Sequence, residues 1–353
     1  REREGQPVAQ PVGEEQLGGR EADVALAQAQ HRLAVQLGRP VGVGVRVHSA
    51  LGAAGGSRGV EPEGRVVGAG GGCALGRLVR LQESLELAAT GYTFTEGPAW
   101  DGARLIFSDI PGDTVYAFIP GEGPPTVLYT PSASANGHTF DREGRLLNAE
   151  HGSGEITRWT QQDGRKTVVA AYQGKHLNSP NDVVVRSDGL ILFTDPPYGL
   201  GQRASEVGFS GVFAFDEATG RMVLIDNAHA RPNGLALSPD EKVLYVGDTA
   251  TQTLWAYDLA ADGIASGKRL VADVTDESKP GRVDGVRVDT EGRVYFTCPG
   301  GICVADPVRG EVIERLATPK RATNLAWGAP EEGQRFPARL SMTVINEVGA
   351  LAQ

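Results

Sequence analysis

The sequence predicts an all-β fold, a six-bladed β-propeller preceded by an N-terminal extension that has no fold of its own. Three observations lead to this prediction. A unit of four short apolar segments recurs from Phe94 onward, each unit begins with a polar residue, and no segment has a sustained helical period. Four short strands in a unit of about 40 to 50 residues are typical of a propeller blade.

Each unit begins with a polar residue that we call its head. The heads are Glu96 in "TEGPAW", Asn136 in "ANGHTF", Asn181 in "SPNDVVV", Asn233 in "RPNGLAL", Asp284 in "RVDGVRV" and Asn324 in "ATNLAW". The spacings between successive heads are 40, 45, 52, 51 and 40 residues. A charged turn such as "DREGR" or "DTEGR" follows most heads, and three further strand-like segments complete the unit. Six heads therefore predict six blades.

The last unit differs from the others. Only 29 residues follow Asn324, and "ARLSMTVINEVGALAQ" matches the other units poorly. The segment Ser84–Thr90 precedes the first head, and we expect it to supply the outer strand of the last blade, because joining both ends of the chain removes exposed sheet edges. The propeller is thus predicted to span residues 85–353, with its last blade a candidate for being incomplete. A β-sandwich or two small β domains is the alternative architecture.

Residues 1–84 have a different composition from the rest of the chain. The first 91 residues contain no Phe, Tyr or Trp, although the whole chain has 22 of these residues. Such a segment has little material for a core. We therefore expect residues 1–84 to be a disordered extension, or a translation of sequence upstream of the natural start. The opening "REREGQPVAQ" has mixed charges and does not resemble a signal peptide, so a cytoplasmic location is the default expectation.

The overall composition narrows the class of protein and of partner. A net charge of -10 and a pI near 5.2 argue against nucleic acid or an anionic membrane as the main partner. No apolar run approaches the roughly 18 residues of a membrane span. Three cysteines cannot form a disulfide framework. Cys298 and Cys303 could meet across a turn, but we expect unpaired thiols, which favours a reducing compartment.

The heads are candidate metal ligands. The first strand of each blade lines the central channel of a propeller, so the heads should converge there. The four strongest candidates are Glu96, Asn181, Asn233 and Asp284. Converging carboxylates need protons or a cation, and a set of oxygen donors favours Ca²⁺, then Mg²⁺ or Mn²⁺, with Zn²⁺ also possible. A single Asn-Gly or Asp-Gly is more often a turn, but recurrence in one register favours metal binding. Asn136 and Asn324 are predicted to be channel-lining amides.

The head motifs carry a family resemblance. "TEGPAW", "LNSPNDVVVRSDGLILFTDPPYG", "RPNGLALSPDEKVLYVGDT" and "VDGVRVDTEGRVYFT" closely resemble the gluconolactonase family, which includes the SMP-30/regucalcin proteins. The resemblance covers Phe94 to about Trp327. It implies a six-bladed propeller with one divalent cation held by Glu96, Asn233 and Asp284, and with Asn181 beside it as a ligand or substrate contact. The implied reaction is hydrolysis of a sugar lactone, such as glucono-1,5-lactone, to the aldonate. The N-terminal segment and the tail beyond Gly328 depart from the family's pattern.

A mechanism follows from this site. The cation would polarise the lactone carbonyl or lower the pKa of a bound water. Asp284 is the predicted general base and later proton donor to the ring oxygen, with Asp182 the second choice. Asn181, Asp182 and Tyr198 are predicted substrate contacts.

Other polar residues are predicted to have structural roles. His138 is expected to be a core or channel-lining histidine. The "EHG" segment, Glu150 to Gly152, ends a strand and could border the pocket, but an ordinary turn is the expected role. The acids of "SDI", "GDT" and "FDE", at the ends of strands, are expected to be solvated turn residues.

Two alternatives remain at this stage. The same site could hydrolyse another lactone or a phosphotriester, because pocket loops set specificity. The chain could instead be a non-catalytic calcium-binding propeller that serves as an interaction platform. A serine route is not supported, since residues 85–353 contain no G-x-S-x-G elbow.

Overall fold

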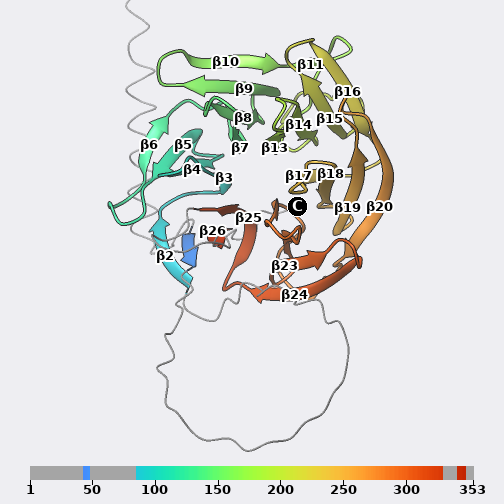
Figure 1. Cartoon of the computed structure of the whole chain (residues 1–353). Helices are drawn as coiled ribbons and strands as arrows, with labels where there is room; N and C mark the ends of the chain where they lie inside the picture. The colour runs from blue at the N-terminus through green and yellow to red at the C-terminus, as the bar shows by residue number, and fades with distance from the viewer. Residues whose placement is uncertain (1–42, 48–84, 329–339, 347–353) are drawn as a thin grey trace, which may run out of the picture. The chain divides into compact units, whose positions relative to one another are not determined.

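The computed structural model describes residues 43–47, 85–328 and 340–346, and within these ranges the regular elements are all β-strands. Five four-stranded sheets, each built from four consecutive antiparallel strands, surround a common centre as the blades of a propeller (Figure 1). The predicted all-β propeller is therefore confirmed, with five blades formed in this way. The described residues include no helix of the length and apolarity that a membrane span requires.

The five blades follow one another in chain order, and each begins with its innermost strand. Blade 1 contains β3 (Thr95–Trp100), β4 (Leu105–Asp109), β5 (Thr114–Phe118) and β6 (Thr126–Tyr129). Blade 2 contains β7 (Ala135–Phe140), β8 (Leu146–Glu150), β9 (Glu155–Thr160) and β10 (Gly164–Val169). Blade 3 contains β13 (Val183–Val185), β14 (Ile191–Asp195), β15 (Gly211–Asp216) and β16 (Arg221–Asp226).

The remaining two blades have the same strand order. Blade 4 contains β17 (Pro232–Leu237), β18 (Val243–Asp248), β19 (Thr253–Leu259) and β20 (Ala265–Asp273). Blade 5 contains β21 (Val286–Val288), β22 (Val294–Cys298), β23 (Gly301–Asp306) and β24 (Glu311–Ala317). Between blades 2 and 3 in the chain, β11 (Ala171–Tyr172) and β12 (Lys175–His176) form a small separate hairpin.

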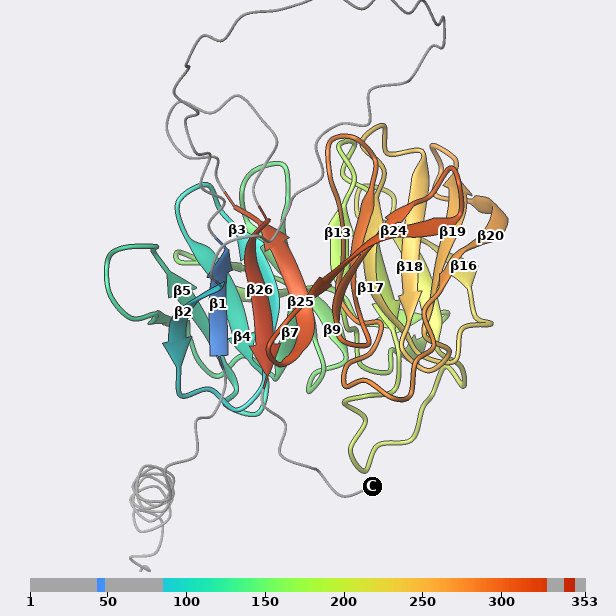
Figure 2. The ribbon, with the colours of Figure 1, turned by 90° about the horizontal axis from the view of Figure 1, so that it is seen from below.

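A further sheet combines strands from both ends of the chain, and we call it the terminal sheet. Its order is β2 (Leu85–Thr90), β1 (Val43–Val47), β26 (Leu340–Asn346) and β25 (Arg321–Trp327). Strand β2 lies at the edge, where the sequence predicted it, and the four strands lie side by side in Figure 2. Strand β25 contacts β3 of blade 1 as well as β21 and β22 of blade 5. Apart from β1, residues 1–84 lie outside the described residues, so the predicted disordered extension stays a prediction.

The hydrophobic core lies between neighbouring blades. Leu147 and Ile156 of blade 2 pack against Phe193 and Phe213 of blade 3, and the two phenylalanine rings stack with their centroids 5.4 Å apart. Both faces of a blade are covered in this way, so all five residues of β14 are buried. This explains why the middle strands are continuous apolar runs, since burial of apolar surface is the main force that holds the blades together.

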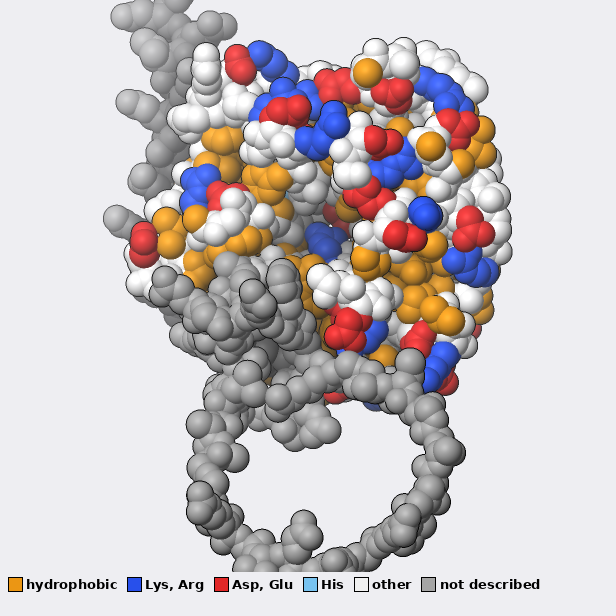
Figure 3. All heavy atoms as spheres, viewed as in Figure 1, with side chains coloured by type: hydrophobic (Ala, Val, Ile, Leu, Met, Phe, Trp, Pro, Cys, Tyr) orange, Lys and Arg blue, Asp and Glu red, His pale blue; other side chains and the backbone are white. Residues whose placement is uncertain are grey.

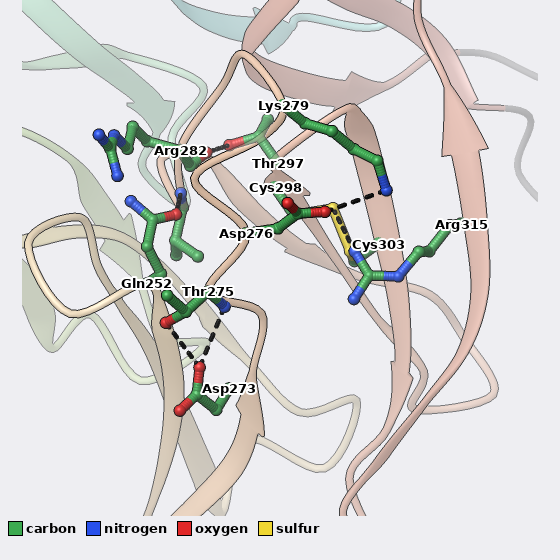
Figure 4. The surroundings of a disulfide bond; sticks show 11 residues. Gln252, Asp273, Thr275, Asp276, Lys279, Arg282, Thr297, Cys298, Cys303 and Arg315 are labelled. Atoms are coloured by element: carbon green, nitrogen blue, oxygen red, sulfur yellow. Dashed lines mark hydrogen bonds and ion pairs between the residues drawn. A yellow bond between two sulfur atoms is a disulfide. The ribbon is translucent and has the colours of Figure 1, made fainter.

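The cysteine prediction was wrong. Cys298 and Cys303 form a disulfide between β22 and β23 of blade 5 (Figure 4). Cys298 pairs with Gly301 and Cys303 pairs with Phe296, so the hairpin register places both side chains on the same face of the sheet, with their Cα atoms 5.8 Å apart. Arg315 points at the sulfur atoms, and its Nη1 lies 3.1 Å from the Sγ of Cys303.

Candidate functional site

Four of the six heads lie within innermost strands, whereas Asn181 and Asp284 come two residues before β13 and β21. Strand pairing shifts register at the four heads that lie within strands. Such shifts occur between Glu96 and Ala99, between Ala135 and His138, between Pro232 and Leu235, and between Ala322 and Asn324. A β-bulge redirects side chains and is common next to binding sites. The bulges therefore turn the head side chains away from the regular pleat.

Consecutive heads contact each other around the centre of the propeller. Four hydrogen bonds join neighbouring blades at the heads. Gly137 N donates to Asn181 O at 2.8 Å between blades 2 and 3, and Thr194 Oγ1 donates to Asn233 O at 2.7 Å between blades 3 and 4. Gly234 N donates to Asp284 O at 3.0 Å between blades 4 and 5, and Gly285 N donates to Thr323 O at 2.8 Å between blade 5 and β25. Thr323 Oγ1 donates to the carbonyl oxygen of Thr95 at 3.3 Å, which links β25 to blade 1. The ring closes where the Oγ of Ser108 in blade 1 lies 2.6 Å from the Nε2 of His138 in blade 2. We call the six heads the head ring.

The glycines that follow the heads explain the recurrent Asn-Gly and Asp-Gly pairs. A Cβ atom on Gly234 would lie 2.3 Å from the carbonyl oxygen of Asp284, and a Cβ on Gly137 would lie 2.6 Å from that of Asn181. Neither glycine has a positive φ, so the backbone conformation of a turn is not the reason for their presence. Glycine is needed here because neighbouring blades approach closely at the centre.

Three buried carboxylates gather at the head ring, from Glu96, Asp182 and Asp284. Burial and the negative charge of Glu96 raise the pKa of Asp284 well above its usual range, and Asp182 adds to this effect. Burial also raises the pKa of Glu96, although Asn324 donates a hydrogen bond to its Oε2 at 2.9 Å. These carboxyl groups are therefore close enough to oppose each other's ionisation.

The amides of the head ring are held by their nitrogen ends. Asn233 donates from Nδ2 to the Oγ1 of Thr249 at 2.9 Å. The Nδ2 of Asn136 lies 3.0 Å from the Nε2 of His151, and the Nδ2 of Asn181 lies 3.5 Å from the same nitrogen. An amide that is tied through its nitrogen keeps its oxygen for another partner. The arrangement leaves the Oδ1 atoms of Asn181 and Asn233 available to accept a hydrogen bond from a ligand or to coordinate a cation.

His151 is a residue that the sequence analysis missed. It follows β8 in the "EHG" turn, but its side chain is buried and reaches the amides of blades 2 and 3. Burial lowers the pKa of His151 to about 4, so the ring is neutral near pH 7 and its Nε2 can accept hydrogen bonds. One signal was available, since "EHG" ends the second strand beside the head strand.

Asp182 lies inside the propeller. Its Oδ2 is 3.3 Å from the Nη1 of Arg287, which comes from blade 5. Arg287 also donates to the carbonyl oxygen of Pro98 in blade 1 at 3.4 Å, so this ion pair joins three blades across the centre. In Figure 3 the face in view is hollowed at its centre, and a basic side chain lies within the hollow.

Tyr198 lies in the loop after β14 and approaches the ring from blade 3. Burial and the negative charge of Asp284 raise the pKa of Tyr198, so its hydroxyl stays protonated at neutral pH. The guanidinium carbon of Arg231 lies 5.1 Å from the centroid of the Tyr198 ring. The ring of His151 lies 6.3 Å away on another side. Tyr198 is thus a neighbour of both His151 and Asp284.

The prediction of solvated acids at strand ends was wrong for two of the three segments. Asp109 of "SDI" and Asp248 of "GDT" are buried, as is Asp195 at the same position of blade 3. Each carboxylate accepts hydrogen bonds from the backbone N–H groups three and two residues before its head. The bonds run from Thr93 and Phe94 to Asp109, from Asn178 and Ser179 to Asp195, and from Ala230 and Arg231 to Asp248.

We call these three residues the anchor aspartates, because they fix the segments that carry Glu96, Asn181 and Asn233. In blade 5 the equivalent strand-end position is Cys298. Only Asp216 of "FDE" behaves as predicted, since it is partly exposed and accepts from Thr219 within its own turn.

His138 is a core residue, one of the two roles that the sequence predicted. Its Nε2 lies 2.6 Å from the Oγ of Ser108 in blade 1, and its Nδ1 lies 2.8 Å from the Oδ1 of Asn148 in blade 2. Burial lowers the pKa of His138 to about 4. The neutral imidazole therefore joins two blades through buried hydrogen bonds.

The donor set of the head ring determines which cation it could hold. Within residues 85–328, no group of three or more His, Cys, Asp or Glu is arranged to hold a metal ion. The head ring instead combines the carboxylates of Glu96 and Asp284 with amide oxygens, which suits a hard, oxygen-binding cation. Two mutually opposed carboxylates provide the negative charge that such a cation would balance.

Comparison with known proteins identifies the family. A model of the SMP-30/gluconolactonase/LRE-like region matches residues 94–336. The chain belongs to this family. The SMP-30/gluconolactonase resemblance of the head motifs is thereby confirmed, and the match includes all six heads.

Relatives of known name or structure include gluconolactonases. The chain is 33% identical over 261 residues to a gluconolactonase of Zymomonas mobilis, a match that covers 66% of this chain and 72% of that protein. The solved structure of a gluconolactonase from Xanthomonas campestris superimposes with a TM-score of 0.63 at 32% identity, over 72% of this chain and 86% of that one. A calcium-binding regucalcin from Agrobacterium tumefaciens shares the fold, with a TM-score of 0.56 at 19% identity over 72% of this chain and 90% of that one.

Proposed function

We propose that this chain is a lactonase that depends on a divalent cation and opens a sugar lactone to the aldonic acid. The observation that carries the proposal is the convergence of Glu96, Asn233 and Asp284 in a closed ring of heads. The gluconolactonase relatives support lactone hydrolysis as the reaction. The same geometry supports a sixth blade, because β25 of the terminal sheet carries Asn324 into the ring.

Four residues would hold the cation: Glu96, Asn181, Asn233 and Asp284. Ca²⁺ is the preferred ion, because all the donors are oxygens and the structural relative with the same fold is a calcium-binding protein; Mg²⁺, Mn²⁺ or Zn²⁺ are the alternatives. A bound cation would supply Lewis-acid polarisation of the lactone carbonyl or a water of lowered pKa. It would also offset the mutual repulsion of Glu96 and Asp284.

The protein's own groups supply the proton transfers and the orientation of the substrate. Asp284 is buried beside Glu96 and Asp182, and we assign to it the removal of a proton from water and its return to the ring oxygen. The protonated hydroxyl of Tyr198 donates to a substrate oxygen beside Asp284. Asn181 and Asp182 border the same space from blade 3, and Asp182 is further held by Arg287.

The test is hydrolysis of glucono-1,5-lactone by the full chain with Ca²⁺ present, followed as acid release at constant pH. Asp284→Asn should reduce kcat by a factor of about 100 or more, the order expected for loss of a general base. Asp216→Asn is the matched control, because Asp216 ends the third strand of blade 3 and is partly exposed, and its turnover should equal that of the wild type. Near wild-type turnover by Asp284→Asn would remove Asp284 from the mechanism. Tight Ca²⁺ binding without turnover of any lactone would favour the platform alternative.

A further inference from the structure

Two arginines lie in the head segments that flank the Asp284 head. Arg321 begins β25, and its Nη2 lies 3.8 Å from the Oδ2 of Asp284. Arg231 directly precedes β17 of blade 4, and its guanidinium stacks on the Tyr198 ring, which itself lies beside Asp284. Strand β21 of blade 5 contacts both β17 and β25. The two arginines therefore belong to the two segments that neighbour the Asp284 head in the ring, and Arg321 contacts Asp284 directly.

Both arginines keep donors that the described residues do not use. The Nε of Arg321 is buried and makes no hydrogen bond within residues 85–328. The side chain of Arg231 makes neither an ion pair nor a hydrogen bond in that part of the chain, and its stacking on Tyr198 leaves the edge of the guanidinium open. By contrast, Arg282, which stands two residues before Asp284, binds Glu277 through both Nη atoms. A guanidinium has five N–H donors, so Arg231 and Arg321 can bind a further acceptor.

The charges at the ring indicate what this acceptor is. Asp182 and Arg287 neutralise each other as an ion pair. A divalent cation would balance Glu96 and Asp284, and the positive charges of Arg231 and Arg321 would then be uncompensated. The chain as a whole has a net charge of -10, so a positively charged site would be opposite in sign to the chain as a whole. A concave site of one sign attracts ligands of the other.

We propose that the substrate is an anionic sugar lactone, one that carries a carboxylate or phosphate at a position away from the lactone group, and that Arg231 and Arg321 bind this group. The proposal rests on the proposed lactonase function and adds the substrate class. Arginine suits this role because its planar fork donates two parallel hydrogen bonds to a carboxylate or phosphate. A neutral lactone such as glucono-1,5-lactone would leave both guanidinium groups without this partner.

The decisive experiment measures binding without turnover. Isothermal titration of the Ca²⁺-loaded full chain compares three open-chain acids: gluconate, glucarate with a second carboxylate, and 6-phosphogluconate. At least one of the two acids that carry a second anionic group should bind about tenfold or more tightly than gluconate, the order of a charge-assisted hydrogen bond. If glucarate binds more tightly, the arginines recognise a carboxylate. If 6-phosphogluconate binds more tightly, they recognise a phosphate.

Variants assign the preference to the two arginines. Arg231→Gln and Arg321→Gln should each lower the preference for the acid with the second anionic group severalfold, and Arg321→Lys should retain part of it. Arg309→Gln is the control, since Arg309 lies in the exposed turn between β23 and β24 and should keep the wild-type preference. Equal binding of all three acids by the wild type, or an unchanged preference in both glutamine variants, would overturn the inference.

Kinetics separate this inference from the proposed function. The ratio of kcat/KM for an anionic lactone to that for glucono-1,5-lactone should fall in both glutamine variants, mainly through KM. Absence of turnover with every lactone would reject the lactonase function, and the binding preference would still decide the role of the arginines. Turnover of glucono-1,5-lactone in preference to the anionic lactones would reject the anionic substrate class and leave the lactonase function intact.

Discussion

The backbone N–H of Gly234 donates a hydrogen bond to the carbonyl oxygen of Asp284 at 3.0 Å, which fixes the asparagine head of blade 4 against the aspartate head of blade 5. This contact requires that residue 234 has no side chain, because a Cβ would lie 2.3 Å from the same oxygen. The position of a catalytic candidate is therefore set by a glycine in the neighbouring blade.

Gly234→Ala should separate these two heads. We expect a loss of about 1 to 3 kcal/mol in the free energy of unfolding, the order of overpacking in a rigid core, together with weaker cation binding. Urea unfolding and calorimetric Ca²⁺ titration would measure the two effects. Gly144→Ala is the control for the Ca²⁺ titration alone, because the added methyl group lies in open space; its φ of 73° makes alanine strained there, so it should lose stability but keep the wild-type Ca²⁺ affinity. Equal Ca²⁺ affinities for wild type and Gly234→Ala would show that the contact does not position the site.

The anchor aspartates should matter more than other acids at strand ends. Asp195→Asn removes one of the two acceptors that hold the backbone of Asn178 and Ser179. An unpaired buried N–H costs about 1 to 3 kcal/mol, so the free energy of unfolding should fall by that amount. Asp216→Asn, at an exposed strand end, should change it by about 0.5 kcal/mol or less. Similar unfolding midpoints for both variants would contradict the anchoring role.

His151 should act as a hydrogen-bond acceptor for the amides. His151→Gln keeps an acceptor oxygen for Asn136 and Asn181, whereas His151→Phe keeps the ring volume without an acceptor. We expect Ca²⁺ affinity to fall about tenfold in the phenylalanine variant, the size of effect typical when a group that orients a ligand is lost. The glutamine variant should lie closer to wild type. Equal affinities in both variants would mean that His151 only fills space.

The stability of the protein should depend on pH through His138. Burial lowers the pKa of His138 to about 4, below its value of about 6.5 in an unfolded chain, so between these two values the unfolded state binds more protons. Stability is therefore present above about pH 6.5 and is lost progressively as the pH falls toward 4, by roughly 3 kcal/mol for this residue. His138→Gln should reduce the slope of unfolding free energy between pH 4.5 and about 6.5. An unchanged slope would indicate that the imidazole titrates as it does in water.

The sequence was sufficient to predict the repeat and the residues that form the ring, because head and strand motifs recur at a nearly constant spacing. It was not sufficient where two blades meet. The hydrogen bonds of His151 to Asn181 and of Asp182 to Arg287 depend on how far each blade is rotated about the centre, which no local pattern encodes.

The acids at strand ends show the same limit. Asp248 and Asp216 both end apolar strands, and only the three-dimensional fold shows that Asp248 accepts from the backbone before a head while Asp216 accepts from Thr219 within its own turn. The disulfide was mispredicted because the number and spacing of cysteines say little about whether a hairpin register places two of them on one face.

The central claim is that the oxygen atoms of the head ring hold a divalent cation on which lactone hydrolysis depends. The most direct measurement is the hydrolysis of glucono-1,5-lactone and of an anionic lactone by the full chain after removal of metal with a chelator, and again during stepwise return of Ca²⁺. Activity should disappear with the chelator and return when about one Ca²⁺ ion per chain has been added. The Asp284→Asn variant should remain inactive after Ca²⁺ is added. Full lactonase activity in the metal-free protein would contradict the account.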